Sequence, residues 1–106
     1  MDKVLVEFDP FEVRCLRPGG LVERLSWTEL RAVLLETNAS GPWGVDVYWV
    51  LVGQRGGCVV PLDAAGGEGL LEHLQKLPGF DNESVIQAMA CCEVKRFVCW
   101  ERDRPG

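Results

Sequence analysis

The sequence lacks most of the residue patterns from which enzymatic chemistry is recognised. It contains a single histidine, His73, so no pair of histidines can hold a metal ion. No glycine loop carries the lysine of a phosphate-binding motif, and no serine lies in a nucleophile elbow. The five cysteines include no pair at the Cys-x2–4-Cys spacing typical of zinc sites. We therefore predict no catalytic residue, no metal and no cofactor.

Long apolar runs and an excess of positive charge are also missing. The longest apolar run, residues 47–52, is far shorter than the roughly 20 residues that cross a bilayer. The net charge of −5 disfavours binding to nucleic acids and to anionic lipids. The first residues, Met-Asp-Lys-Val, do not resemble a secretory signal. We expect a cytoplasmic protein with free thiols that binds neither nucleic acid nor membranes.

Three of the cysteines, Cys91, Cys92 and Cys99, fall within nine residues of each other. Adjacent residues of a helix point about 100° apart, so Cys91 and Cys92 seldom hold one ion together. Free cysteine packs as a small hydrophobe, and Cys15 and Cys99 share predicted strand faces with apolar residues. We expect the cysteines to fill the core, with Cys91 as the thiol placed for exposure. A reactive pair of Cys91 with His73 is the enzymatic alternative, although His73 is otherwise expected at the surface.

Alternating apolar residues predict strands in the first sixty residues and again near the end. The predicted strands cover residues 4–8, 11–16, 21–25, 45–52, 58–62 and 94–100. Residues 31–37 suit either a strand or a helix, and we favour a strand because the run is short and contains β-branched residues. Residues 26–29 match a capping box and predict a short helical turn. Amphipathic stripes predict helices over residues 68–77 and 81–92.

This order of elements predicts one α+β domain over residues 1–106. Strands grouped before helices indicate a single antiparallel sheet, here of about six to seven strands. Two consecutive helices before the last strand are expected to share one face of that sheet. The hairpin over residues 45–62 is apolar on both faces, so we expect it to lie centrally and to be covered on each side.

Tryptophan is abundant, with four residues in 106. Three are expected in the core or at its edge: Trp27, Trp49 and Trp100. Trp43 differs because it lies in a Gly-Pro-Trp-Gly loop, where an indole either packs back onto the sheet or stands out as a binding anchor. We take Trp43, together with the acidic residues Glu36 and Asp46, as the candidate binding residues.

Three stretches, "ERLSWTELRAVLLET", "GPWGVDVYWVLVG" and "LPGFDNESVIQAMA", together resemble a group of small, mostly uncharacterised bacterial proteins. Some members of that group look like immunity proteins encoded beside contact-dependent or polymorphic toxins. The resemblance covers most of the chain but contains no catalytic signature, so it transfers no site residues. It implies a non-enzymatic protein that neutralises a toxin domain by direct binding. An acidic inhibitor suits a basic toxin domain because opposite charges speed association and exclude wrong partners.

The early strands also look like those of bacterial pleckstrin-homology-like domains. Two helices before the last strand depart from that pattern, in which a single helix closes the barrel. A small barrel domain of unknown housekeeping role, binding a lipid or a peptide, is therefore the alternative hypothesis.

Overall fold

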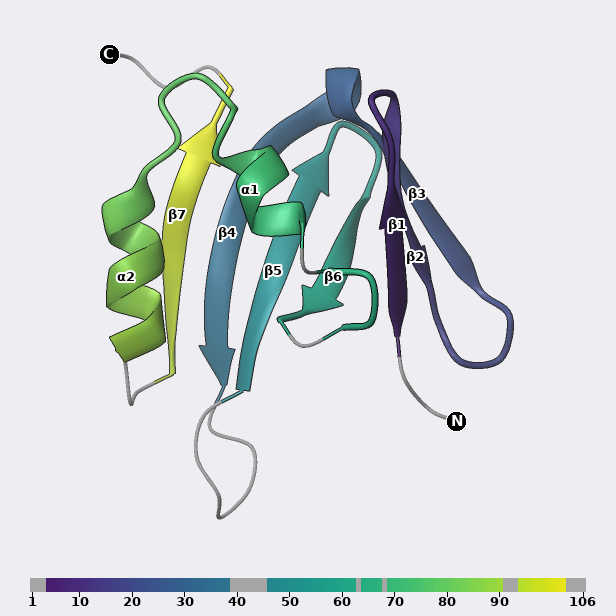
Figure 1. Cartoon of the computed structure of the whole chain (residues 1–106), viewed down its shortest axis with the longest axis horizontal. Coiled ribbons are helices and arrows are strands. Elements are labelled where there is room, and N and C mark those ends of the chain that lie inside the picture. The colour runs from purple at the N-terminus through teal and green to yellow at the C-terminus, as the bar shows by residue number, and fades with distance from the viewer. Residues whose placement is uncertain (1–3, 39–45, 63, 68, 91–93, 103–106) are drawn as a thin grey trace.

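The computed structural model contains two separate antiparallel sheets and two short α-helices (Figure 1). It describes residues 4–38, 46–62, 64–67, 69–90 and 94–102. The three-stranded sheet has the order β1-β2-β3, with β1 (Leu5–Phe8), β2 (Glu12–Leu16) and β3 (Val22–Ser26). The four-stranded sheet has the order β6-β5-β4-β7, with β4 (Leu30–Asn38), β5 (Asp46–Gly53), β6 (Gly57–Pro61) and β7 (Lys95–Glu101). The helical elements are the 3-10 turn η1 (Trp27–Glu29), α1 (Leu70–Leu74) and α2 (Asn82–Ala90).

The prediction of one α+β sheet covered by a pair of helices is wrong, and so is the barrel alternative. The seven described strands are divided between two sheets, because the turn η1 leads the chain from the end of β3 into a new sheet at β4. The helices do not form the expected layer of two consecutive helices. Helix α1 has only five residues and lies over β4 and β5, whereas α2 runs along β7 (Figure 1). Helix α1 ends at Leu74, so residues 75–77 of the helix predicted over residues 68–77 form turns instead. Gly79, at a φ of 79°, then turns the chain before α2 begins.

The ambiguous segment 31–37 is a strand, as favoured from the sequence. It belongs to β4, which is hydrogen-bonded to β5 on one side and to β7 on the other. Its side chains alternate, so Val33, Leu35 and Thr37 are buried while Leu34 and Glu36 are partly exposed. The neighbours of β4 supply the hydrogen bonds that a helix would have made internally.

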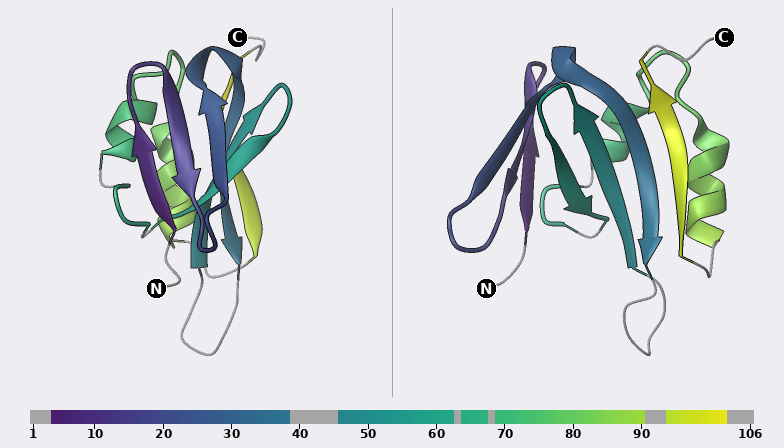
Figure 2. Two further views of the ribbon diagram at one scale, coloured as in Figure 1. Left: turned by 90° about the vertical axis from the view of Figure 1, so that its right-hand side faces the viewer. Right: turned by 180° about the vertical axis from the view of Figure 1, so that it is seen from behind.

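One hydrophobic core occupies the space between the two sheets and the helices. The fully buried side chains of the four-stranded sheet include Leu35 and Leu51, and those of α1 are Leu70 and Leu74. The helices lie on one face of the four-stranded sheet, and the three-stranded sheet lies beside β6 (Figure 2). Neither the helices nor the three-stranded sheet covers the opposite face of the four-stranded sheet in the described part of the chain (Figure 2).

Two of the tryptophans expected in the core are buried there. Trp49 and Trp100 are 2% and 5% exposed, and the Trp100 indole nitrogen donates a hydrogen bond to the carbonyl of Pro78 at 2.8 Å. Trp27 lies at the core edge and donates from Nε1 to the carbonyl of Asp9 at 2.7 Å. These hydrogen bonds satisfy polar atoms that burial would otherwise leave without a partner.

A β-bulge in β7 explains why the successive residues Cys99 and Trp100 are both buried. Val33 pairs with Trp100 and the next residue, Leu34, pairs with Val98, so Cys99 is an extra residue in β7. The carbonyl of Cys99 accepts a hydrogen bond from the backbone nitrogen of Asp81 at 2.7 Å. The bulge therefore joins the end of the sheet to the start of α2.

None of the described helices is long and apolar enough to cross a membrane.

His73 is half-buried, which corrects the expectation of a surface histidine. Its ring lies between those of Trp27 and Phe8, with centroids 4.5 Å and 5.2 Å away. The contact fastens α1 to the edge of the three-stranded sheet. Burial lowers the pKa of His73 below its ordinary value of 6.5, and the positive charge of Lys76 lowers that pKa further.

We expect the free energy of unfolding to decrease as the pH falls below about 7. The unfolded chain takes up a proton at His73 near pH 6.5, while the folded chain, with its lower pKa, resists protonation. Urea unfolding between pH 7.5 and 5.5 measures this decrease. In His73→Phe, which keeps a ring between Trp27 and Phe8, the decrease over that range should be smaller. An equal decrease in the variant and the wild type would show that His73 does not cause it.

Candidate functional site

Of the three predicted binding residues, the structure describes Glu36 and the backbone of Asp46. Glu36 projects from β4, and Asp46 is the first residue of β5, paired with Asn38. The side chain of Asp46 and the whole of Trp43 lie outside what the structure describes. The anchor role of Trp43 therefore stays a prediction.

An apolar row crosses the uncovered face of the four-stranded sheet. The cross-strand pairs are Val59 with Val50, Val50 with Leu34, and Leu34 with Val98, so one residue from each strand lies in line. We call these four residues the outer row. Val59 is 42% exposed and Val98 is 36% exposed, while Val50 and Leu34 are partly exposed between them. An apolar row with no described element on top of it is a surface suited to a partner.

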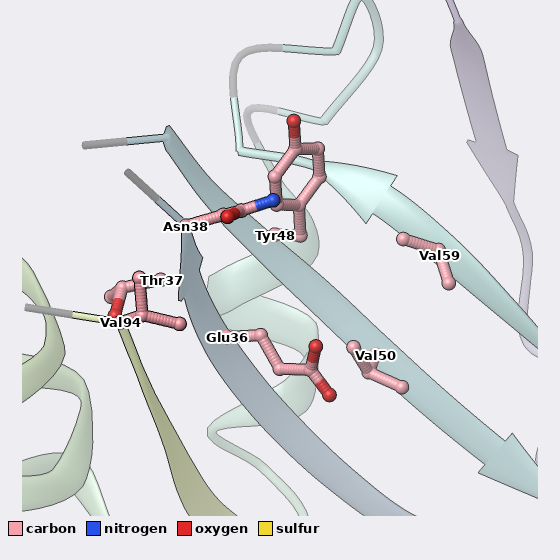
Figure 3. Close-up of a pocket in the computed structure, with 7 residues that line it drawn as sticks. All are labelled: Glu36, Thr37, Asn38, Tyr48, Val50, Val59 and Val94. Carbon is pink, nitrogen blue, oxygen red and sulfur yellow. The ribbon is translucent and has the colours of Figure 1, made fainter. Parts of the chain in front are cut away.

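A hollow of about 500 Å³ opens on the same face, at the end of the sheet nearer the β4–β5 loop (Figure 3). Its lining residues are Glu36, Thr37, Asn38, Tyr48, Val50, Val59 and Val94. Val50 and Val59 lie side by side in the hollow, and the carboxylate of Glu36 extends toward Val50 (Figure 3). The Asn38 amide lies beside the Tyr48 ring (Figure 3). The hollow thus combines an apolar floor with one carboxylate, one amide and one phenol.

The carboxylate of Glu36 is held by an exposed cation. Oε2 of Glu36 lies 2.8 Å from Nε of Arg96, its cross-strand neighbour on β7. The Arg96 side chain is 66% exposed, so solvent screens the pair and its strength is on the order of 1 kcal/mol or less. Because Arg96 lies at Oε2, a second cation can approach the carboxylate at Oε1.

Thr37 fixes the strand edge beside the hollow. Its hydroxyl accepts a hydrogen bond from the backbone nitrogen of Lys95 at 2.9 Å and lies 3.3 Å from the carbonyl of the same residue. Thr37 is the one buried polar residue among those the structure describes. Its hydroxyl joins β4 to the start of β7, where Val94 forms one side of the hollow.

Several charged groups of the three-stranded sheet pair with one another, and a smaller hollow of about 260 Å³ opens at β3. Its lining residues are Glu23, Arg24, Leu25, Glu29, Arg55, Gly56 and Gly57. Arg14 donates from Nη1 to Asp9 at 3.0 Å and to Glu12 at 2.7 Å. Backbone hydrogen bonds from Glu12 and Phe11 lower the pKa of Asp9 below its ordinary value. Asp9 thereby closes the turn between β1 and β2, which is a structural role.

Three cysteines fill the core, as expected from the sequence: Cys15, Cys58 and Cys99 are buried and free. Burial raises the pKa of Cys58 and of Cys99 to about 11, so these thiols are protonated and unreactive at neutral pH. Cys91 and Cys92 lie outside the described residues, so the exposure of Cys91 stays untested. No three His, Cys, Asp or Glu side chains gather around a common point within the described ranges.

Sequence reasoning found Glu36 but missed the outer row. Val50 and Val59 belong to a hairpin that is apolar on both faces, which led to the wrong prediction that both faces are covered. The helices and the second sheet cover a single face. The apolar pattern itself was the signal, since an apolar strand face needs either the protein core or a partner to cover it.

Replacing Thr37 by Val should lower the free energy of unfolding by roughly 1–3 kcal/mol, because the backbone nitrogen of Lys95 loses its acceptor. Thr37→Ser keeps the hydroxyl, so it should lower the free energy of unfolding by clearly less. Urea denaturation of the two variants beside the wild type measures both effects. A loss in Thr37→Val no larger than the loss in Thr37→Ser would show that the hydroxyl contributes no more than the methyl group, and would contradict the role given to the hydrogen bond.

Comparison of the chain with protein-family models, with curated proteins and with solved structures found no match. The outer row and the hollow therefore carry the functional argument without help from a relative.

Proposed function

We propose that this protein is a non-enzymatic binding module that recognises another protein through the uncovered face of its four-stranded sheet. The observation that carries the proposal is the outer row, in which one apolar residue from each of four strands faces solvent. Isolated exposed apolar residues are common on protein surfaces, but an aligned row with a hollow beside it is not.

The uncovered face has the mixture of groups that stable interfaces use. Apolar side chains lie at its centre, and polar or charged groups, including Glu36 and Arg96, lie along one side of the row. A partner that covers about 800 Å² of this side, more than the row alone, would form an interface of standard size. Association of this kind requires no chemical step.

Neutralisation of a toxin domain is the most specific form of the proposal. It is supported by the resemblance of three stretches of the chain to immunity proteins and by the net charge of −5, which suits a basic toxin domain. The buried free thiols support a reducing compartment, and we propose a cytoplasmic location. A basic toxin domain encoded beside the gene should bind the purified chain in a one-to-one complex.

We expect a photo-crosslinking residue, p-benzoylphenylalanine, to capture a discrete protein when it replaces Val59 and the chain is expressed in its native cells. The same residue in place of Ile86 is the matched control, because Ile86 is 68% exposed but lies on α2. Gel analysis with mass spectrometry measures the adducts. Adding Val98→Glu should abolish the adduct while leaving the melting temperature nearly unchanged, since Val98 lies at the surface.

Two results would contradict the proposal. One is an adduct of equal yield from position 86, and the other is an adduct from position 59 that survives Val98→Glu in a chain that is still folded.

A further inference from the structure

We infer that the hollow beside the outer row accepts a lysine side chain from a basic segment of the protein partner. This inference rests on the proposed function, since it names the chemistry of the partner that docks on the same face. It follows from the hollow lined by Glu36, Tyr48, Val50 and Val59.

The floor of the hollow suits an aliphatic chain. Val50 and Val59 are cross-strand partners, and their side chains lie next to each other at the base (Figure 3). Val59 is 42% exposed, so a hydrocarbon stem laid across the pair removes apolar surface from water. A short polar side chain would leave the apolar surface of Val50 and Val59 in contact with water.

The side of the hollow formed by Glu36 suits a positive charge. The Glu36 carboxylate extends over the floor toward Val50, and the Tyr48 ring lies along the same strand (Figure 3). A carboxylate attracts a cation directly, and the face of a phenol ring attracts it further. A carboxylate-bearing ligand would be repelled, and a fully apolar one would cover Glu36 without giving it a new partner.

The existing ion pair favours lysine over arginine. Oε2 of Glu36 is already ion-paired with Nε of Arg96 at 2.8 Å, which leaves Oε1 as the carboxylate oxygen without a partner among the described residues. A guanidinium binds best when both carboxylate oxygens are available to its fork, whereas a lysine ammonium can use a single acceptor. The Asn38 amide also lines the hollow and can accept from a cation that enters it.

The overall charge of the chain also favours a basic partner. A net charge of −5 attracts a basic segment and steers its approach at low ionic strength. A lysine among β-branched neighbours would then place apolar side chains near the outer row and its ammonium group in the hollow.

The test uses nuclear magnetic resonance titration of the full chain with a synthetic pentapeptide, acetyl-TVKVT-amide. The comparison peptides replace the lysine by norleucine, which keeps the aliphatic stem without the charge, or by arginine. We expect the lysine peptide to shift the backbone amide signals of Asn38, Tyr48, Val50 and Val59. Its affinity in 10 mM salt should exceed that of the norleucine peptide by about fivefold and that of the arginine peptide by a smaller factor.

Glu36→Gln should remove the preference for lysine, because the carboxylate is lost while the shape of the side chain is kept. The matched control is Glu101→Gln, which removes the same charge from an exposed position of β7 outside the hollow and should keep most of the preference. Equal affinity for the lysine and norleucine peptides, or an equal loss in both variants, would overturn the inference and leave the proposed function intact. Tighter binding of the arginine peptide than of the lysine peptide would also overturn it. So would unchanged amide signals at Asn38, Tyr48, Val50 and Val59. Failure of the crosslink at position 59 would instead count against the proposed function itself.

Discussion

The side chains of a strand alternate between two faces, and the described helices and the three-stranded sheet cover only one face of the four-stranded sheet. Trp49 and Leu51 are buried in the core, so Val50 between them must point to the other side. Cross-strand pairing then aligns Val50 with Val59 and Leu34. A shift of the strand register by one residue would instead turn the buried side chains, such as Trp49 and Leu51, toward solvent. The register that holds the core together is therefore the same register that builds the outer row.

This arrangement separates stability from recognition. The side chains that hold the fold together, such as Leu35 and Leu70, lie on the covered side, and those proposed to meet a partner lie on the open side. Between the two, Thr37 uses its hydroxyl to tie β4 to β7 at the edge of the hollow. In the proposed recognition, the outer row would supply apolar area, and Glu36 would supply a charge that selects among partners. Neither group is needed to fill the core.

Sequence periodicity predicted the strands, including 31–37, but not their division into two sheets. Periodicity records which side of a strand is apolar, and it does not record which strand lies beside it. The turn at residues 27–29 was expected from a capping box, yet Ser26 makes no side-chain cap and η1 ends after three residues. Helix α2 was predicted from an amphipathic stripe, but only Val85 and Ala88 are buried against β7, and Met89 on the same helix is 46% exposed. The bulge at Cys99 depends on hydrogen bonds to distant residues, so no local pattern could reveal it.

The central claim is that the open face of the four-stranded sheet is the surface that meets a partner. Methyl-labelled protein, added to an extract of the cells that make it, tests this claim most directly by nuclear magnetic resonance. The methyl signals of Val50, Val59 and Val98 should broaden, while those of Ile86 and Met89 on α2 stay sharp. Selective broadening on α2, or equally sharp signals on both surfaces, would contradict it.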